Sequence, residues 1–332
     1  MSAIAVLGAG AWGTALGVAL ARSGRQVKLW ARDARQAEAI AHAGRNQRYL
    51  PEVELPATLP VTAQLPAALD GAELLLGATP VAGLRELLRR LRAASSTAPL
   101  VWLCKGFEQD SGRLAHQIVE EELGGAIASG ALSGPSFALE VAQGLPCALT
   151  LASRDAGFAR RAAGLLHGGR LRIYYSADLI GVEIGGAVKN VMAIAVGICD
   201  GLDLGQNARA ALITRGLAEI SRLGTALGGR TETFMGLAGA GDLILTATGD
   251  LSRNRRVGLE LARGRKLAEI LADLGHVAEG TRSAREVARL ASQHAVEMPI
   301  TQAVNEVLEG RLAPAAAAEL LLARDPKREA FN

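Results

Sequence analysis

The chain has 332 residues, which favours two domains, and its composition of 49% hydrophobic and 21% charged residues is typical of a globular protein with a sizeable core. The net charge of +3 is spread along the sequence without a basic, aromatic-rich tract, which argues against nucleic-acid binding. Cys104, Cys147 and Cys199 lie far apart, and no histidine is spaced with a cysteine as a zinc site requires. We therefore expect a cytoplasmic protein without disulfides or a bound metal.

One uncharged stretch, residues 2–21, approaches the length of a membrane span or of a signal peptide's apolar region. No lysine or arginine precedes it, so the positive region of a signal peptide is missing. It also contains three spaced glycines, which have a better explanation below. We expect neither export nor a membrane span.

The first half alternates short apolar runs with amphipathic segments, which predicts a mostly parallel sheet with helices on both faces. Strands are expected at 3–8, 26–30, 72–79, 100–104, 126–132, 146–152 and 171–175. Helices are expected at 11–23, 33–44, 82–93, 111–123 and 155–167. Four prolines within 50–66 predict a loop there.

The second half loses the strand pattern and predicts helices. They are expected at 181–199, 207–228, 253–264, 266–274, 281–295 and 299–309. The sequence thus predicts a doubly wound, Rossmann-like α/β domain over 1–182 and an all-helical substrate and catalytic domain over 183–332. We expect a cleft between the two.

The first expected strand leads into a helix through Gly8, Gly10 and Gly13, which fit the G-x-G-x-x-G pattern of dinucleotide binding. The first glycine permits the tight turn, the second lets the pyrophosphate approach, and the third lets the helix pack on the strand. The main chain of Ala11 and Trp12 would then offer N–H groups to the anion.

The second strand is followed by adjacent Arg32 and Asp33. A carboxylate near this point holds the ribose 2′-hydroxyl of NAD, whereas an arginine accommodates the 2′-phosphate of NADP. Both residues are also compatible with a solvated loop pair. We favour NADP(H), with NAD(H) as the alternative cofactor.

Two lysines stand where an anionic carbonyl substrate would need positive charge. Lys105 follows a predicted strand at the edge where ligands bind in an open α/β sheet. Lys189 lies in "EIGGAVKNVMAIAVGI", where no residue three or four positions away can pair with its ammonium group. Each is alternatively an ordinary solvated lysine.

Three further turns carry candidate polar groups. In "LSGPSFALE", Gly134 and Ser136 are either donors to a bound substrate or, for the serine, a helix N-cap. Asp242 follows a glycine-rich turn and has the same N-cap alternative. In "LSRNRR", Ser252 can cap a helix whose first turn holds Arg253 and Asn254. Positive charge at a helix N-terminus is unfavourable unless an anion is bound, so the motif fits phosphate recognition; an exposed arginine cluster is the alternative.

These motifs together resemble the bacterial NAD(P)-dependent glycerol-3-phosphate dehydrogenases over nearly the whole chain. The similarity runs through nine ordered blocks: "GAGAWGTAL", "LVWLCKGFE", "SGPSFALE", "GGAVKN", "NARAALITRGLAE", "GLAGAGDL", "SRNRR", "VAEGTRS" and "MPIT". The resemblance implies reversible reduction of dihydroxyacetone phosphate to sn-glycerol 3-phosphate, in the service of phospholipid synthesis.

The resemblance also implies roles for individual positions. Lys189 matches the family's proton donor and acceptor. Substrate-binding positions are matched by Lys105, Gly134, Ser136, Lys189, Asp242, Ser252, Arg253 and Asn254. Nucleotide-binding positions are matched by Ala11, Trp12, Arg32, Tyr49, Lys105, Ala138, Arg253, Val277 and Glu279. A possible homodimer is left open.

Small departures from the family pattern are visible, and two rival functions remain. Ala11 replaces a more usual serine or threonine, Cys104 replaces threonine, and "GPSF" replaces "GPTF". A related 2-hydroxyacid dehydrogenase would share both halves and a lysine close to an asparagine. A nucleotide-binding redox sensor would need neither lysine.

Overall fold

The computed structural model describes residues 3–109, 111–274 and 278–324. The chain divides into two compact units, Met1–Leu179 and Ile180–Asn332. This division falls at the start of helix α8 (Leu179–Gly201), whereas the sequence placed the boundary after residue 182. The two units are described in turn.

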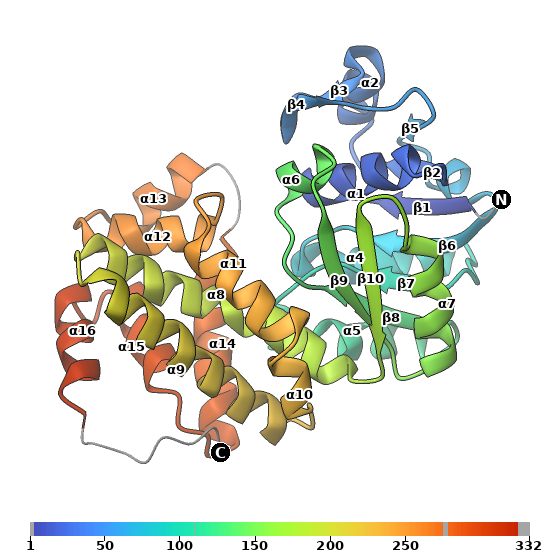
Figure 1. Ribbon diagram of the computed structural model, residues 1–332. Helices are drawn as coiled ribbons and strands as arrows, with labels where there is room; N and C mark the ends of the chain where they lie inside the picture. Colours follow the sequence, from blue (N-terminus) through green and yellow to red (C-terminus); the bar gives the residue numbers. More distant parts are fainter. Residues whose placement is uncertain (1–2, 110, 275–277, 325–332) are drawn as a thin grey trace. The chain divides into compact units, whose positions relative to one another are not determined.

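The first unit contains an eight-stranded sheet in the order β10-β9-β8-β7-β6-β1-β2-β5 (Figure 1). Its strands are β1 (Ala3–Leu7), β2 (Gln26–Trp30), β5 (Val61–Thr62), β6 (Ala72–Gly77), β7 (Leu100–Trp102), β8 (Ser129–Ser133), β9 (Cys147–Ala152) and β10 (Leu171–Ser176). All neighbouring strands are parallel except β8 and β9. The mostly parallel sheet is confirmed, and its strand order reverses at β1, where such folds bind ligands.

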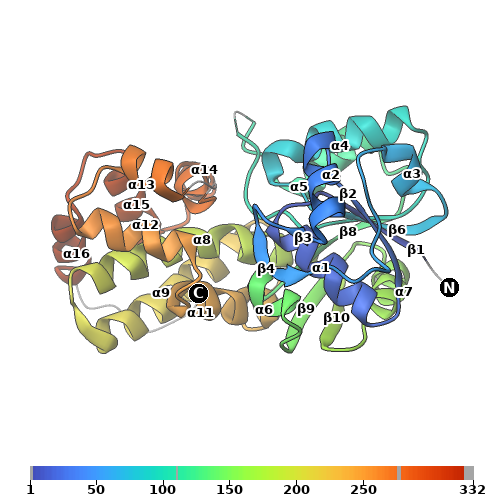
Figure 2. The same ribbon diagram turned by 90° about the horizontal axis from the view of Figure 1, so that it is seen from above.

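Helices cover both faces of this sheet. One apolar core joins alternate strand residues such as Val6 and Val101 to α1 (Ala11–Arg22), α6 (Ala138–Ala142) and α7 (Ala156–Leu166). The other face packs against α4 (Val81–Ala93) and α5 (Ala115–Leu123), which lie side by side in Figure 2. The remaining helices of the unit are α2 (Ala34–Ala43) and α3 (Leu65–Leu69). The uncharged stretch 2–21 thus becomes β1 and most of α1.

The predicted loop at 50–66 is only partly a loop. It contains β4 (Leu50–Glu54), which pairs with β3 (Arg45–Asn46), and also β5 and the start of α3. Pro51 is tolerated because the β3–β4 pairing shifts register next to it, and Pro66 occupies the first turn of α3. The prolines therefore limit these elements to short lengths without abolishing them.

The second unit is helical in its described residues. Its helices are α8, α9 (Gly205–Ala226), α10 (Thr231–Phe234), α11 (Asp242–Thr248), α12 (Arg253–Ala262), α13 (Leu267–Leu274), α14 (Gly280–Gln293), α15 (Pro299–Leu308) and α16 (Pro314–Leu322). A π-helical turn, Leu237–Gly241, precedes α11. The sequence patterns missed α10, α11, α16 and the π turn. The first two and the π turn are too short to show a clear helical period, and α16 (PAAAAELLL) has no alternation of apolar and polar faces.

Helix α8 is the centre of this unit. It is long and apolar enough to cross a membrane, yet 94% of its apolar window is buried inside the structure. Glycines allow the backbones of α8 and α12 to touch: a Cβ on Gly197 would lie 2.0 Å from the Arg255 carbonyl, and one on Gly258 would lie 2.1 Å from the Ile194 carbonyl. The apolar surface of α8 is therefore accounted for by helix packing.

A buried carboxylate joins two other helices of the same unit. Glu219 on α9 is 1% exposed and accepts hydrogen bonds from the backbone N–H groups of Ile300 (2.7 Å) and Thr301 (3.1 Å) at the start of α15. It thus caps a helix distant in sequence. Burial raises the pKa of Glu219 to about 7, although these hydrogen bonds act in the opposite direction.

This pKa predicts a pH-dependent stability. The folded protein holds the Glu219 proton more tightly than the unfolded chain does. The protonated Glu219 therefore adds to the free energy of unfolding at low pH, and this stabilisation is lost as the pH rises towards about 7. Relative to Glu219→Gln, which cannot ionise, the wild-type free energy of unfolding should fall between pH 5 and pH 8, by at most about 1.4 kcal/mol per pH unit. Urea titrations across this range measure it, and parallel pH profiles would contradict it.

Candidate active site

The glycine-rich turn after β1 has two packed glycines and one open glycine. Gly8 has φ 134°, and a Cβ there would lie 2.4 Å from the Ala78 carbonyl, while a Cβ on Gly13 would lie 2.0 Å from the Gly8 carbonyl. By contrast, a Cβ on Gly10 would meet nothing within 4 Å. Gly8 and Gly13 therefore build the turn, and Gly10 borders open space.

Helix α1 begins directly at this open space. Its N-cap is Gly10, which supplies no side-chain hydrogen bond, and Ala11 and Trp12 follow as partly exposed residues. The first N–H groups of a helix need external partners, and an anion is a favourable one. The turn and the helix start therefore fit the pyrophosphate of a dinucleotide, as predicted.

The two candidate ribose-binding residues after β2, Arg32 and Asp33, differ in their interactions. Asp33 caps α2, accepting a hydrogen bond from the Arg35 N–H at 2.8 Å. Arg32 is exposed, and within the described residues its side chain has no hydrogen bond or ion pair. Tyr49 lies with its ring under the Arg48 guanidinium, 5.2 Å from the ring centre. Arg32, unlike Asp33, is therefore not used in a hydrogen bond or ion pair within the described part of the protein and is available to a ligand.

Three predicted substrate residues of this unit meet at one carbonyl group. The Gly134 carbonyl accepts hydrogen bonds from Lys105 Nζ (3.2 Å) and Ser136 Oγ (3.0 Å). Gly134 has φ 137°, a conformation that favours glycine. Ser136 is not an N-cap, because α6 begins after Phe137 and has no side-chain cap. The carboxyl ends of β7 and β8 therefore bring together polar groups from separate motifs.

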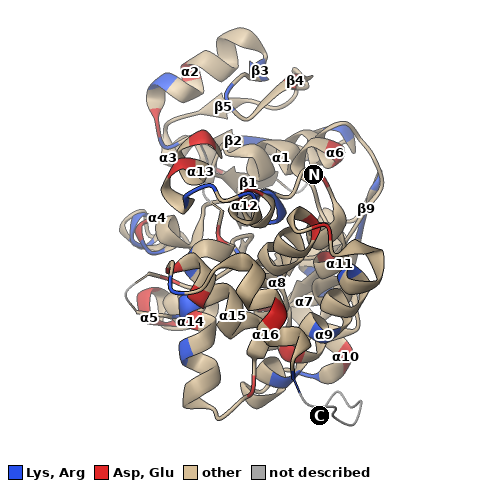
Figure 3. Cartoon of the chain, turned by 90° about the vertical axis from the view of Figure 1, so that its left-hand side faces the viewer, with Lys and Arg blue, Asp and Glu red and all other residues tan. Residues whose placement is uncertain are grey.

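An ion-pair network supports the segment after Lys105. Arg85 on α4 binds both carboxylate oxygens of Glu108 (2.8 and 2.7 Å) and also bonds Glu121 and Glu122 of α5. Figure 3 marks the acidic residues of α5 in red and the basic residues of α4 in blue. The Arg85 guanidinium holds the pKa of Glu108 below its usual range, so this carboxylate stays ionised at neutral pH.

In the second unit, Lys189 has partners that its own helix could not supply. It is 6% exposed, forms an ion pair with Asp242, and donates a hydrogen bond to Thr246 Oγ1 at 2.9 Å. Thr246 Oγ1 in turn donates to the Asp242 carbonyl at 2.7 Å. Asp242 lies 53 residues after Lys189 and is 1% exposed. The alternative of an ordinary solvated lysine is therefore wrong for Lys189.

The π-helical turn brings Asp242 to this place. Asp242 ends the turn and starts α11, so its N-cap alternative is wrong: its side chain binds Lys189 instead. A Cβ on Gly185 of α8 would lie 2.4 Å from the Ala238 carbonyl in the turn. Gly185 therefore allows α8 and the π turn to approach, which is a packing role.

The start of α12 divides its polar residues between capping, structure and solvent. Ser252 caps the helix as predicted, accepting from the Arg255 N–H at 3.2 Å. Arg255 itself pairs with Asp200 (2.8 Å) and Asp250 (3.1 Å), so part of the positive charge in the first turn is compensated without an anion. Arg253 is exposed, and among the described residues its side chain forms no hydrogen bond or ion pair.

Asn254 connects this turn to α8. Its amide donates to Asn190 Oδ1 (3.0 Å) and accepts from the Gly280 N–H (3.0 Å), and the side chain is buried. Asn190 follows Lys189 directly, so the lysine and the arginine cluster are held in one framework of this unit. Glu279 precedes α14 and Ala138 begins α6. Val277 lies outside the described residues.

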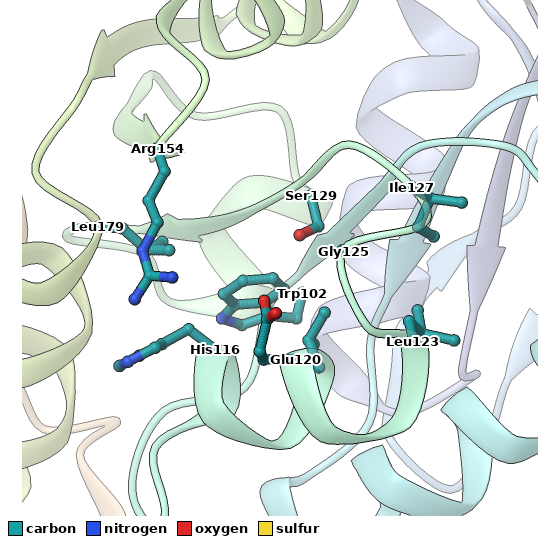
Figure 4. A pocket seen from close by; sticks show the side chains of 10 residues that line it. Trp102, His116, Glu120, Leu123, Gly125, Ile127, Ser129, Arg154 and Leu179 are labelled. Carbon is teal, nitrogen blue, oxygen red and sulfur yellow. The ribbon is translucent and has the colours of Figure 1, made fainter.

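A separate hollow in the first unit shares no residue with the predicted site (Figure 4). Its lining comes from the end of β7, from α5, from the start of β8 and from the loop after β9, and includes Trp102, His116, Glu120, Ser129 and Arg154. Among the described residues, no three His, Cys, Asp or Glu side chains form a metal-binding group. Cys104, Cys147 and Cys199 form no disulfide with one another.

Comparison with known proteins settles the family. Residues 3–159 match the family model for the NAD-dependent glycerol-3-phosphate dehydrogenase N-terminus, and residues 178–319 match the model for its C-terminus. The chain belongs to this family. A glycerol-3-phosphate dehydrogenase [NAD(P)+] from Nitrosospira multiformis is 57% identical over 331 residues, covering 99% of both chains. One from Dechloromonas aromatica is 59% identical over 327 residues, covering 98% of this chain and 99% of the relative.

Solved structures agree with this assignment. The crystal structure of glycerol-3-phosphate dehydrogenase from Coxiella burnetii superposes with a TM-score of 0.92 at 44% identity, covering 97% of this chain and 99% of the other. The family resemblance, the fold and the assignment as an NAD(P)-dependent oxidoreductase are therefore confirmed. The rival functions, a 2-hydroxyacid dehydrogenase and a redox sensor, are not favoured by any of these relatives.

Two polar residues of the dehydrogenase were not singled out from the sequence. Thr246 lies one helical turn after Asp242, and that spacing places both on one side of α11. Asn190 is adjacent to Lys189 and binds Asn254. The four-residue spacing of Thr246 from Asp242 is visible in the sequence, but the contact of Thr246 with Lys189 depends on how α8 and α11 pack.

The Thr246 contact can be tested with a matched pair of substitutions. Thr246→Val keeps the volume but removes the hydroxyl that binds Lys189, so we expect kcat to fall about tenfold with NADPH affinity unchanged. Thr248→Val is the control, because Thr248 makes the same type of bond within α11, to the Ile244 carbonyl (2.8 Å), but is exposed. Equal kcat values for the two variants would contradict a role for Thr246 in holding the lysine.

Proposed function

We propose that Lys189 is the acid–base group for the reversible reduction of dihydroxyacetone phosphate to sn-glycerol 3-phosphate, the reaction named for this family. The observation that carries the proposal is a buried ammonium fixed by Asp242 and Thr246 at the centre of the helical unit. Burial of a charged pair costs stability unless it is well bonded, so its retention suits a functional group.

The residues of the glycine-rich turn fit NADPH or NADH, which when bound supplies the hydride that reduces the substrate carbonyl. Gly10, Ala11 and Trp12 would hold the pyrophosphate through main-chain N–H groups. Tyr49, Lys105, Ala138, Arg253, Val277 and Glu279 are proposed as further nucleotide contacts on the family pattern. This binding orients the reaction partners, which lowers the entropic cost of the step.

Proton delivery is the task of Lys189. As the carbonyl carbon receives hydride, negative charge develops on the carbonyl oxygen, and the ammonium stabilises that charge and donates its proton. Asp242 and Thr246 keep the Nζ group in place before the step. In the reverse direction the neutral amine accepts the alcohol proton.

Recognition of the substrate phosphate is assigned to the start of α12. Arg253 is exposed, Asn254 is fixed by its two hydrogen bonds, and Ser252 shapes the first turn. Guanidinium and main-chain donors suit a phosphate dianion. Lys105, Gly134 and Ser136 are proposed as further substrate contacts, and binding energy from the phosphate helps to align the carbonyl.

The activity is tested by following NADPH or NADH absorbance after addition of dihydroxyacetone phosphate. Loss of absorbance with this substrate, and none with small 2-oxoacids or with the oxidised forms of small β-hydroxyacids, is the expected result. A preference for unphosphorylated substrates would favour the 2-hydroxyacid dehydrogenase alternative. Nucleotide binding without turnover of any substrate would favour the sensor.

A substitution of Lys189 tests the acid–base assignment. Lys189→Met should lower kcat/KM by about a thousandfold, within the usual range of general acid–base catalysis, while NADPH binding persists. Because the substitution leaves Asp242 buried without a cation, a second variant combines it with Asp242→Asn. Lys266→Met, at an exposed lysine, is the control. Retention of more than a few per cent of wild-type activity in both Lys189 variants would refute the assignment.

The nucleotide preference is a separate prediction. If Arg32 binds the 2′-phosphate, Arg32→Ala should raise the KM for NADPH tenfold or more, which is roughly the loss of one charge-assisted hydrogen bond, and leave the KM for NADH nearly unchanged. Arg35→Ala is the control, since that arginine is also exposed and close in sequence. Equal effects on both nucleotides would refute the preference for NADP(H).

The physiological setting is proposed on the same basis. We expect a cytoplasmic enzyme that supplies glycerol 3-phosphate to glycerophospholipid synthesis, with substrate and catalytic groups in the domain from residue 183 onward. A homodimer is the proposed assembly. Light scattering of the purified protein measures the mass, for which a monomer would be about 34.4 kDa.

A further inference from the structure

The carbonyl group of Ala9, in the middle of the glycine-rich turn, receives two side-chain hydrogen bonds from outside the turn. Gln36 Nε2 of α2 donates at 2.8 Å and Asn46 Nδ2 of β3 donates at 3.0 Å. Neither bond belongs to α1, whose first turn instead uses the Gly10 carbonyl as acceptor for the Thr14 N–H (3.0 Å). Two separate elements therefore act on one peptide group.

That peptide group also carries the Gly10 N–H. In a trans peptide the C=O and N–H bonds point in opposite directions, so fixing the Ala9 carbonyl fixes where the Gly10 N–H points. The donors hold the carbonyl on the side of α2 and β3, which turns the N–H away from them. Gly10 borders open space, since a Cβ there would meet nothing within 4 Å.

The Asn46 amide uses its donors on the turn, while its own acceptor is left without a hydrogen bond. Asn46 is 1% exposed, and its Nδ2 group donates both to Ala9 and to Thr14 Oγ1 (2.8 Å). Its Oδ1 atom is buried without a hydrogen-bond partner. A buried acceptor left in this state is unfavourable, so stability alone does not explain an asparagine here.

We propose that Asn46 and Gln36 are positioning residues for the cofactor: they hold the Ala9 carbonyl so that the Gly10 N–H is presented to the pyrophosphate of NAD(P)H. Their contribution to affinity comes from preorganisation, because an N–H that already points at the ligand needs no reorientation on binding. The β3–β4 hairpin, in which Asn46 lies, thereby has a function in nucleotide binding.

Isothermal titration of the cofactor-free protein with NADPH tests the proposal. Gln36→Ala removes one donor from a partly exposed side chain and should raise the Kd about two- to tenfold, the loss expected for one hydrogen bond. Asn46→Asp, of nearly the same shape, turns the second donor into an acceptor and should raise it more than tenfold. Glu38→Gln is the control, because Glu38 is exposed on the same helix.

A kinetic split separates positioning from general structural support. The KM for NADPH should rise in Gln36→Ala, while kcat and the KM for dihydroxyacetone phosphate at saturating NADPH stay within twofold of wild type. Should Asn46→Asp fail to fold, Gln36→Ala still decides the question. Equal NADPH affinity in Gln36→Ala and Glu38→Gln would overturn the proposal, as would a fall in kcat with unchanged affinity. Since the inference rests on nucleotide binding, a wild-type protein that bound neither NADPH nor NADH would contradict the proposed function itself.

Discussion

A lysine buried in the middle of an apolar helix is the constraint that the helical unit has to satisfy. Lys189 lies on α8, which is buried among other helices, so its ammonium needs polar partners from those helices. The π-helical turn and α11 supply Asp242 and Thr246. Substitution of Gly185 by a larger residue would prevent the turn from coming this close, because the added Cβ would collide with the Ala238 carbonyl.

The same helix sets the position of the arginine-rich turn. Glycine contacts bring α8 against α12, the Asp200–Arg255 ion pair joins their ends, and Asn254 joins Asn190 to α14. Arg255 is thereby part of the packing between helices, whereas Arg253 stays exposed. Lys189 and the start of α12 thus share one framework within this unit, which favours precise placement of the groups proposed for catalysis and phosphate binding.

In the first unit, backbone packing and side-chain hydrogen bonds fix the shape of the glycine-rich turn. Its glycine-rich turn is shaped from within by Gly8 and Gly13, whose missing side chains allow close backbone contacts. From outside, Asn46 and Gln36 orient the peptide group that leads to Gly10. The local motif provides the space for a pyrophosphate, and residues beyond the motif orient the groups that bind it.

The sequence by itself determined what depends on neighbouring residues and on pattern: the parallel sheet, the helical second half, the glycine-rich turn, the Ser252 cap and the family. Tertiary structure alone decided the partner of Lys189, the pairing of Arg255 with Asp200 and Asp250, and the pairing of β4 with β3 at the start of 50–66. It also showed that Asp242 caps no helix. These outcomes depend on contacts between segments distant in sequence, such as the 53 residues that separate Lys189 from Asp242, and such contacts leave no periodicity in the chain to read.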